Sequence, residues 1–175
     1  DGLTRIVEDL RTLGLFNAGA LELSVTPMDL AVMAREVVAL YAQELDAKAM
    51  SVAAELSPAP VCADPDRIRQ ILLALMDNAM RYAPGGDLVI KTSTAAGMSI
   101  LSCRDYGPGF PPDAIDRAFE PFWRAEESRA RDKGGSGLGL SVVRTIAVAH
   151  GGRVEAVNMS DGGARVSVYL PTQNR

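Results

Sequence analysis

The segment from Asp64 to Gly86 places the strongest constraint on the fold. Asp64 and Pro65 form a helix start, with an N-capping carboxylate followed by a proline at the first helical position. Apolar residues then recur at the i, i+3, i+4, i+7, i+8 and i+11 spacing of a helix buried along one face: Ile68, Ile71, Leu72, Leu75, Met76 and Ala79. The run Pro84-Gly85-Gly86 stops this helix. The chain must therefore supply a second apolar layer for it.

The remaining periodicities predict that layer. Helical spacing predicts three further helices, over 3–16, from Thr26-Pro27 to about Lys48, and over 138–150. A short extended stretch is expected at 21–25. Alternation predicts strands at 51–56, 87–94, 98–105, 153–158 and 164–170, the last four forming two hairpins. Because strands and helices do not alternate strictly, we predict an α+β fold. It is a two-layer sandwich whose mixed, mostly antiparallel sheet carries helices on one face.

Composition excludes some classes of function. The 175 residues carry a formal net charge of −4, which offers no basic footprint for nucleic acid. No apolar run is long enough to span a bilayer, and the first residues do not form a signal peptide. Cys62 and Cys103 match no metal or redox spacing. We interpret them as free thiols of a cytoplasmic domain, with Cys103 in the core on a strand.

Two segments carry residue types suited to a nucleotide, although each is weak by itself. Asn78 lies at the flank of the apolar stripe, with Arg81 and Tyr82 three and four residues further on, and an amide oxygen is a ligand that suits Mg²⁺. An ordinary surface asparagine is the alternative. The second segment, Asp105-Tyr106-Gly107-Pro108-Gly109, follows a strand. Its carboxylate is suited to accept a hydrogen bond from an exocyclic amine, and the alternative is a plain turn.

A third segment is glycine-rich and leads directly into a helix. Residues 134–140 read Gly-Gly-Ser-Gly-Leu-Gly-Leu, and free N–H groups at a helix N-terminus favour a phosphate. No Gly-Lys-Ser/Thr follows, so this is not a Walker loop, and no strand leads into it, so it is not a dinucleotide fingerprint. A flexible hinge is the alternative. The stretch 107–139 as a whole is long enough to be a lid.

In their order and spacing these segments resemble the GHKL ATPase superfamily and, within it, the histidine kinases. Residues 66–82 resemble the N box of that family, 105–109 the G1 box, 119–124 the F box and 135–140 the G2 box. The resemblance covers roughly residues 27–171 and implies a Bergerat-type fold with an ATP lid. It is specific because four boxes occur in order, and the F box separates kinases from the gyrase and chaperone relatives.

The resemblance implies roles for individual residues, with ATP and Mg²⁺ as the bound groups. Asn78 would bind Mg²⁺, Arg81 a phosphate and Asp105 the adenine amine, while Tyr82 would lie against the base or ribose. Arg124, or one of Arg129, Arg131 and Lys133, would reach the γ-phosphate from the lid. The glycines at 107 and 109 would admit the base, and the phosphates would be held by Gly135, Ser136, Gly137, Leu138, Gly139 and Leu140.

One position departs from the family pattern. The kinase N box usually has an asparagine four residues before the metal-binding one, and this chain has Ala74 there. Either the variation is tolerated at some loss of binding or turnover, or the protein is a degenerate kinase that binds nucleotide and transfers poorly. We favour the first interpretation because the other boxes are intact.

The resemblance also predicts the surroundings of this domain. Residues 1–25 would be the tail of a dimerisation and phosphotransfer helix with its linker, and 26–175 the ATP-binding domain. His150 lies at the end of the last predicted helix and lacks the acidic neighbour of a phosphoacceptor. We therefore expect a monomeric fragment that binds Mg-ATP but does not phosphorylate itself. The full-length protein is expected to be a homodimeric, membrane-anchored bacterial sensor kinase, with its own phosphotransfer domain and a cognate response regulator as partners and no nucleic acid.

Two other functions share some of these features. A serine kinase of the anti-sigma type has the same predicted fold, but the F box and the linker-like N-terminus argue against it. A degenerate nucleotide-binding or protein-interaction module without transfer activity rests on Ala74 alone.

Overall fold

The computed structural model describes residues 2–83, 85–111, 114–123 and 136–172, and a five-stranded sheet forms one layer of it. The strand order is β2 (Ser51–Leu56), β4 (Asp87–Ala95), β5 (Met98–Asp105), β7 (Ala164–Pro171) and β6 (Arg153–Asn158). The β2–β4 pair is parallel and the other three pairs are antiparallel. Both predicted hairpins, β4–β5 and β6–β7, are therefore confirmed, as is the mixed, mostly antiparallel sheet.

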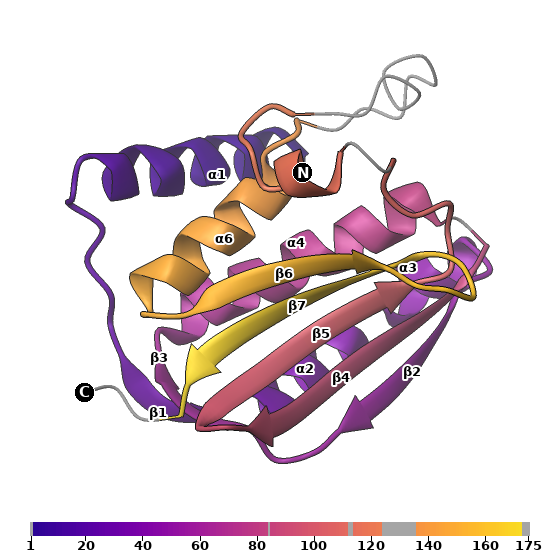
Figure 1. Cartoon of the computed structure of the whole chain (residues 1–175), viewed down its shortest axis with the longest axis horizontal. Coiled ribbons are helices and arrows are strands. Elements are labelled where there is room, and N and C mark those ends of the chain that lie inside the picture. The colour runs from indigo at the N-terminus through magenta and orange to yellow at the C-terminus, as the bar shows by residue number, and fades with distance from the viewer. Residues whose placement is uncertain (1, 84, 112–113, 124–135, 173–175) are drawn as a thin grey trace.

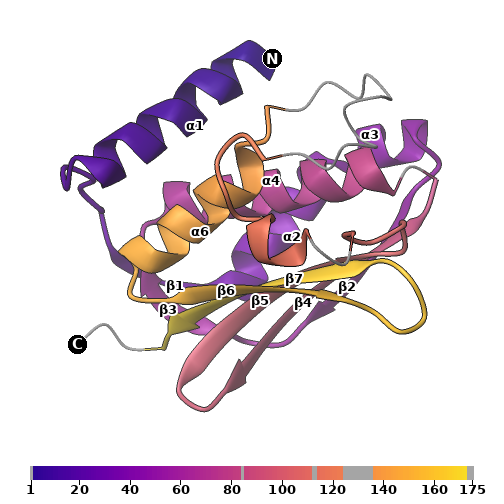
Figure 2. The ribbon, with the colours of Figure 1, turned by 45° about the horizontal axis from the view of Figure 1, so that its top comes forward.

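Helices cover one face of this sheet (Figure 2). They are α2 (Leu30–Leu40), the short α3 (Ala42–Ala47), α4 (Pro65–Tyr82) and α6 (Gly139–Ala149), and a single 3-10 turn, η1, spans Ile115–Arg117. The core lies between the two layers, where Leu88, Ile90 and Leu101 of the sheet are almost fully buried. Cys103 is also buried on β5, as predicted. The two-layer α/β sandwich is thus confirmed.

Helix α4 forms as its sequence predicts. The Asp64 carboxylate caps it by accepting hydrogen bonds from the backbone N–H groups of Asp66 (3.0 Å) and Arg67 (3.2 Å). Each apolar residue of the predicted stripe is at most 2% exposed. Burial of a Leu, Ile or Met side chain contributes about 1.5–3 kcal/mol, so tertiary packing rather than helix propensity holds α4 in place.

The predicted helix start at Thr26 is wrong. Residues Thr26–Asp29 form strand β1, which pairs antiparallel with β3 (Pro60–Ala63), a strand that the sequence did not predict. The helix is capped instead by Asp29, whose carboxylate accepts hydrogen bonds from the N–H groups of Ala31 (2.8 Å) and Ala59 (2.9 Å). The local capping signal at Thr26 did not decide the structure, because β3 supplies backbone hydrogen-bond partners that hold this segment as a strand. The helix also ends at Leu40 rather than near Lys48, and α3 follows it.

Helix α1 (Gly2–Asn17) lies on the side of α4 and α6 that faces away from the sheet (Figures 1 and 2). It contacts α4 through polar side chains: Gln70 donates to Asp9 (3.1 Å), and Arg67 donates to Glu8 (3.3 Å) and Thr12 (3.0 Å). Asp9 and Thr12 are buried, whereas the apolar side chains of Leu3, Val7 and Leu10 are 76%, 59% and 45% exposed. Polar side chains together with Leu13 therefore contact the body of the molecule, whereas Leu3, Val7 and Leu10 are turned outward.

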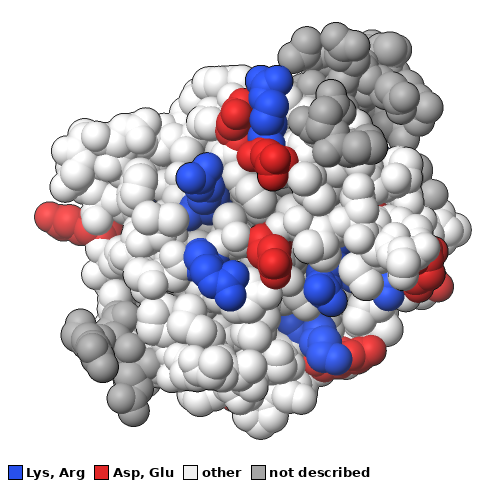
Figure 3. All heavy atoms as spheres, viewed as in Figure 1, with Lys and Arg blue, Asp and Glu red and all other residues white. Residues whose placement is uncertain are grey.

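Surface charge is mixed. Figure 3 shows lysine and arginine side chains interspersed with aspartate and glutamate on the face that it displays, without a broad area of one sign. Among the described residues, no helix is both long enough and apolar enough to cross a membrane.

Candidate functional site

The C-terminal half of α4 is the element that the predicted site shares. Asn78, Arg81 and Tyr82 are half-buried there, as expected for residues at the flank of an apolar stripe. The preceding residue, Asp77, is held from two sides, because the Tyr41 hydroxyl donates to it (2.9 Å) and Arg5 of α1 forms an ion pair with it. This part of α4 is thus fixed by α1 and by the residue that joins α2 to α3.

The turn after β5 lies against the end of α4. A Cβ added at Gly107 would lie 2.9 Å from the carbonyl oxygen of Tyr82 and 3.1 Å from the Cβ of Ala83. Only a glycine allows this close approach. Gly109 has a φ of +75°, in the left-handed region that favours glycine. The second predicted segment therefore meets the first, although about twenty residues of sheet separate them in sequence.

Asp105 presents a half-buried carboxylate at this junction. It accepts a hydrogen bond from the backbone N–H of Gly107 (2.9 Å), and the backbone N–H of Ala164 on β7 also hydrogen-bonds to it. Burial raises the pKa of Asp105, while these two hydrogen bonds and the charge of Arg104 oppose the rise. A carboxylate has about four lone-pair sites, so Asp105 retains acceptor capacity for a ligand amine.

The glycine-rich segment leads into α6 and is linked to the predicted F box. The Gly137 carbonyl accepts a hydrogen bond from the Phe122 N–H (2.9 Å). Gly137 has a φ of +72°, and a Cβ there would lie 2.9 Å from the carbonyl carbon of Phe122. Phe122 itself has a φ of +63°, an uncommon conformation for a bulky residue that tends to occur at functional sites.

The first turn of α6 offers backbone donors. Ser136 Oγ accepts from the Leu138 N–H (3.3 Å), and Leu138 and Leu140 are buried. Leu138 is the N-cap residue of α6, and among the described residues no side chain at this position accepts a capping hydrogen bond from the helix. Its first N–H groups and the positive end of its dipole therefore suit an anion.

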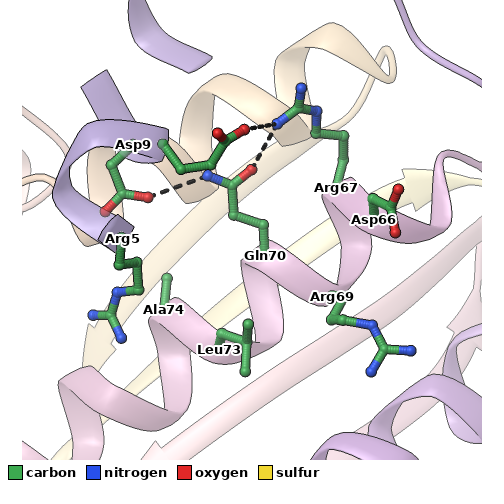
Figure 4. A pocket seen from close by; sticks show the side chains of 9 residues that line it. Arg5, Asp9, Asp66, Arg67, Arg69, Gln70, Leu73 and Ala74 are labelled. Carbon is green, nitrogen blue, oxygen red and sulfur yellow. Dashed lines mark hydrogen bonds and ion pairs between the residues drawn. The ribbon is translucent and has the colours of Figure 1, made fainter. Parts of the chain in front are cut away.

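Ala74 connects this turn to α4. It is 5% exposed and lies one helical turn before Asn78, and a Cβ added at Gly139 would lie 3.9 Å from the Ala74 Cβ. The position that departs from the family pattern thus faces the start of α6. Ala74 also lines a cavity of about 230 Å³ beneath α1, shown in Figure 4, together with Arg5, Glu8, Asp9, Asp66, Arg67, Arg69, Gln70 and Leu73.

Some predicted residues lie outside the described part of the chain: Arg124 and Gly135 of the site, and the alternative lid residues Arg129, Arg131 and Lys133. Within the described part, no group of three or more His, Cys, Asp or Glu side chains is arranged to hold a metal ion. A magnesium ion that is bound mostly by phosphates and water needs few protein ligands, so Asn78 remains a suitable one.

His150 is a structural residue. It is 5% exposed at the end of α6, and its Nε2 accepts a hydrogen bond from the backbone N–H of Asp64 (3.1 Å). Because Nε2 is the acceptor, Nδ1 carries the proton and donates to the Ile146 carbonyl (2.8 Å). The ring is therefore neutral and ties the end of α6 to the start of α4.

Sequence reasoning missed the residues that hold the Asp105 turn from the other side. Asn158 hydrogen-bonds to the backbone of Phe110, and Arg104 forms an ion pair with Asp161 (2.6 Å) while its guanidinium lies 4.2 Å from the centre of the Tyr106 ring. No local pattern marks Asn158 or Asp161, because the residues that they contact are about fifty positions away along the chain.

Comparison with known proteins is consistent with this geometry. Residues 63–174 match the family model of the histidine kinase-, DNA gyrase B-, and HSP90-like ATPases. The signal transduction histidine-protein kinase BaeS of Escherichia coli (strain K12) is 33% identical over 173 residues, which cover 98% of this chain and 37% of BaeS. The chain thus spans little more than a third of that relative.

Two solved structures are similar over almost the whole chain. The histidine kinase AdeS of Acinetobacter baumannii has a TM-score of 0.82 at 32% identity, covering 98% of this chain and 79% of that one. Full-length ShkA, solved in complex with AMPPNP, has a TM-score of 0.82 at 31% identity, covering 97% of this chain and 35% of ShkA.

Proposed function

The chain belongs to the histidine kinase-, DNA gyrase B- and HSP90-like ATPases, and from that premise we propose that it supplies the ATP-binding catalytic domain of a sensor histidine kinase. In the longer protein this domain would transfer the γ-phosphoryl group of ATP to a histidine on an upstream domain.

One observation carries the proposal. The half-buried Asp105 carboxylate and its glycine turn lie against the end of α4, and the first turn of α6 meets the same helix at Ala74. An acceptor for the adenine amine and backbone donors for phosphates therefore lie at two points along one helix that also carries Asn78. ShkA, which has the same fold, was solved with an ATP analogue.

Different residues of this chain would bind the base, the metal ion and the phosphates of Mg-ATP. Asp105 would accept from the adenine amine, with Gly107 and Gly109 admitting the base beside Tyr82. Asn78 would hold Mg²⁺, which when bound neutralises phosphate charge, and Arg81 would approach a phosphate. The phosphates would be held by Gly135, Ser136, Gly137, Leu138, Gly139 and Leu140, with Arg124 reaching them from the lid. Phosphoryl transfer needs mainly positioning and charge neutralisation, which this set supplies.

The partners of the longer protein are part of the same proposal. Residues 1–25 would end a dimerisation and phosphotransfer region, and 26–175 would form the ATP-binding domain. The outward-facing Leu3, Val7 and Leu10 support this, because a helix with a strongly exposed apolar stripe favours packing against another helix. A homodimer, a cognate response regulator and anchoring of the full-length protein at a bacterial membrane complete the proposal.

Calorimetric titration with a non-hydrolysable ATP analogue, with and without Mg²⁺, tests binding. Saturable binding that strengthens with Mg²⁺ and is lost in Asp105→Ala is expected. Transfer is tested separately, by adding ATP and a histidine-bearing upstream fragment. Absence of binding by the wild-type chain would contradict the proposal at its first step, and phosphoserine on a protein partner would point to a serine kinase instead.

Ala74 favours one second candidate, a nucleotide-binding module without transfer activity. Alanine offers no polar group where the start of α6 meets α4. Binding of the analogue without any phosphorylation of the upstream fragment would select this alternative.

A further inference from the structure

We infer that Asn158, at the end of β6, is a positioning residue that holds the turn after β5 in the shape that accepts the nucleotide base. The inference rests on the proposed function, because it concerns the adenine side of that same site. Asn158 itself belongs to none of the four sequence segments that define the site.

Asn158 binds both backbone groups of one residue. Its Oδ1 accepts from the Phe110 N–H at 2.8 Å, and its Nδ2 donates to the Phe110 carbonyl at 2.8 Å. A backbone segment outside regular structure lacks ladder partners, and here one amide side chain satisfies a donor and an acceptor together. Phe110 directly follows the glycine turn, so its position fixes where the turn ends.

The sequence of the turn is adapted to this contact. A Cβ added at Gly109 would lie 2.7 Å from Asn158 Oδ1 and 3.2 Å from the Gly163 carbonyl. A Cβ at this position would displace the Asn158 side chain, so a glycine at 109 is what lets the asparagine make this contact. The two residues form one structural unit.

The rest of the β6–β7 turn holds the other end of the segment. A Cβ at Gly163 would overlap the Asp105 carbonyl, and the next residue, Ala164, hydrogen-bonds through its N–H to the Asp105 carboxylate. The β6–β7 turn is itself closed by the Met159 N–H, which donates to the Gly163 carbonyl at 3.0 Å. The β5 turn is therefore clamped at both ends by one hairpin.

Asn158 is the member of this clamp best suited to set the geometry. The Arg104–Asp161 pair also joins the two turns, but it is an ion pair whose Asp161 side chain is 62% exposed, so salt screens that contact. The two bonds of Asn158 are neutral and directed at backbone atoms, and a planar amide fixes their relative orientation. Loss of this side chain would leave the turn free to sample conformations in which Asp105 and Gly109 no longer face the base.

The test measures separately how the base and the phosphates contribute to binding. Kd is measured with Mg²⁺ for AMPPNP and for inorganic tripolyphosphate, which lacks the base, in wild type, Asn158→Ala and the control Asn17→Ala, another exposed asparagine. Asn158→Ala is expected to weaken AMPPNP binding roughly three- to tenfold, as expected for loss of one or two hydrogen bonds, and to leave tripolyphosphate binding unchanged. Asn17→Ala should match wild type for both ligands.

A second readout follows the turn without any nucleotide. Hydrogen exchange of the Phe110 amide should be faster in Asn158→Ala than in wild type, and Asn158→Asp, which keeps the acceptor but loses the donor, should fall between them. Unchanged Phe110 exchange, or equal losses for AMPPNP and tripolyphosphate, would overturn the inference alone. If wild type binds tripolyphosphate but gains nothing from the base of AMPPNP, the adenine site and this inference both fail.

Discussion

At the scale of single residues, Asp105 combines two demands that conflict. Its carboxylate is half-buried, which raises its pKa, yet the ionised form is the one that accepts a hydrogen bond from an amine most strongly. The backbone N–H groups of Gly107 and Ala164 favour the ionised form and partly restore it. In the proposed site, the burial of Asp105 would therefore make nucleotide binding sensitive to acid.

We predict that nucleotide affinity falls as the pH is lowered, beginning at a higher pH than an ordinary aspartate would cause. The sign follows from the raised pKa, because protonation of Asp105 replaces a charged acceptor by a weaker neutral one. Kd for AMPPNP is measured from neutral pH downward in wild type and in Asp105→Asn, which binds more weakly but has no titrating group at this position. The nucleotide titrates in both, so the ratio of the two Kd values isolates Asp105. A ratio that does not change with pH would contradict the prediction.

Ala74 allows a gain-of-function prediction. Replacement by asparagine restores a polar group one turn before Asn78, and the adjoining cavity of about 230 Å³ offers room for it. We expect Ala74→Asn to tighten Mg-AMPPNP binding roughly two- to tenfold, as one added hydrogen bond would. Ala74→Val is the matched control, since it adds similar bulk without a polar group. Equal effects of the two variants would show that volume rather than polarity matters at this position.

At the scale of elements, α4 depends on the residue just before it. Asp64 accepts from Asp66 and Arg67 of its own helix and also from the Ser24 N–H (2.9 Å), which fixes the segment between α1 and β1. His150 binds the Asp64 backbone, so the end of α6 meets the same point. Asp64 therefore holds together the start of α4, the segment between α1 and β1, and the end of α6.

Removal of this cap should cost more than removal of an ordinary one. Loss of an N-cap side chain costs about 0.5–2 kcal/mol, and the additional loss of the hydrogen bond from the Ser24 N–H raises the expected loss for Asp64→Ala to about 1–3 kcal/mol. Urea unfolding measures the change in the free energy of unfolding. Asp46→Ala, at an exposed position of α3, is the control and should change it by no more than about 0.5 kcal/mol. Similar losses in both variants would contradict the role of Asp64.

At the scale of the whole molecule, α1 packs on the other helices partly through a buried, titratable side chain, Asp9. Asp9 is 3% exposed, and burial raises its pKa, although the hydrogen bond from Gln70 and the charge of Arg5 oppose this. A raised pKa means that protonation of Asp9 favours the state in which α1 is packed on α4, here called the docked state. The contribution is fully present below the usual aspartate pKa of 3.8 and is lost as the pH rises through the higher, docked value.

Asp9→Asn should therefore strengthen the attachment of α1 at neutral pH. An asparagine keeps an acceptor for Gln70 without the penalty of a buried charge. Hydrogen exchange across 2–17 is expected to slow at pH 7 relative to wild type, and the difference should disappear below about pH 3.8. Glu22→Gln, at an exposed position between α1 and β1, removes the same charge and should leave exchange unchanged. Faster exchange in Asp9→Asn would mean that the ionised carboxylate holds α1 in place.

Elements with local signals could be predicted from the amino-acid sequence. Helix α4 has its cap, stripe and stop within about twenty consecutive residues, and both hairpins have their turns between alternating strands, so each was predicted nearly to the residue. The glycine segments were found for the same reason, since a close approach or a left-handed φ at Gly107, Gly109 and Gly137 demands that residue type. Such features depend on interactions between near neighbours, which a sequence displays directly.

Features that depend on distant partners could be seen only in the folded chain. The segment Thr26–Asp29 has the capping chemistry of a helix but became β1, because β3 supplies it with a strand more than thirty residues away. His150 became a neutral link to Asp64, 86 residues away, and Asn158 became a clamp on Phe110, 48 residues away. Separations of this size are set by how the layers pack, and no local pattern in the chain records which pairs that packing will bring together.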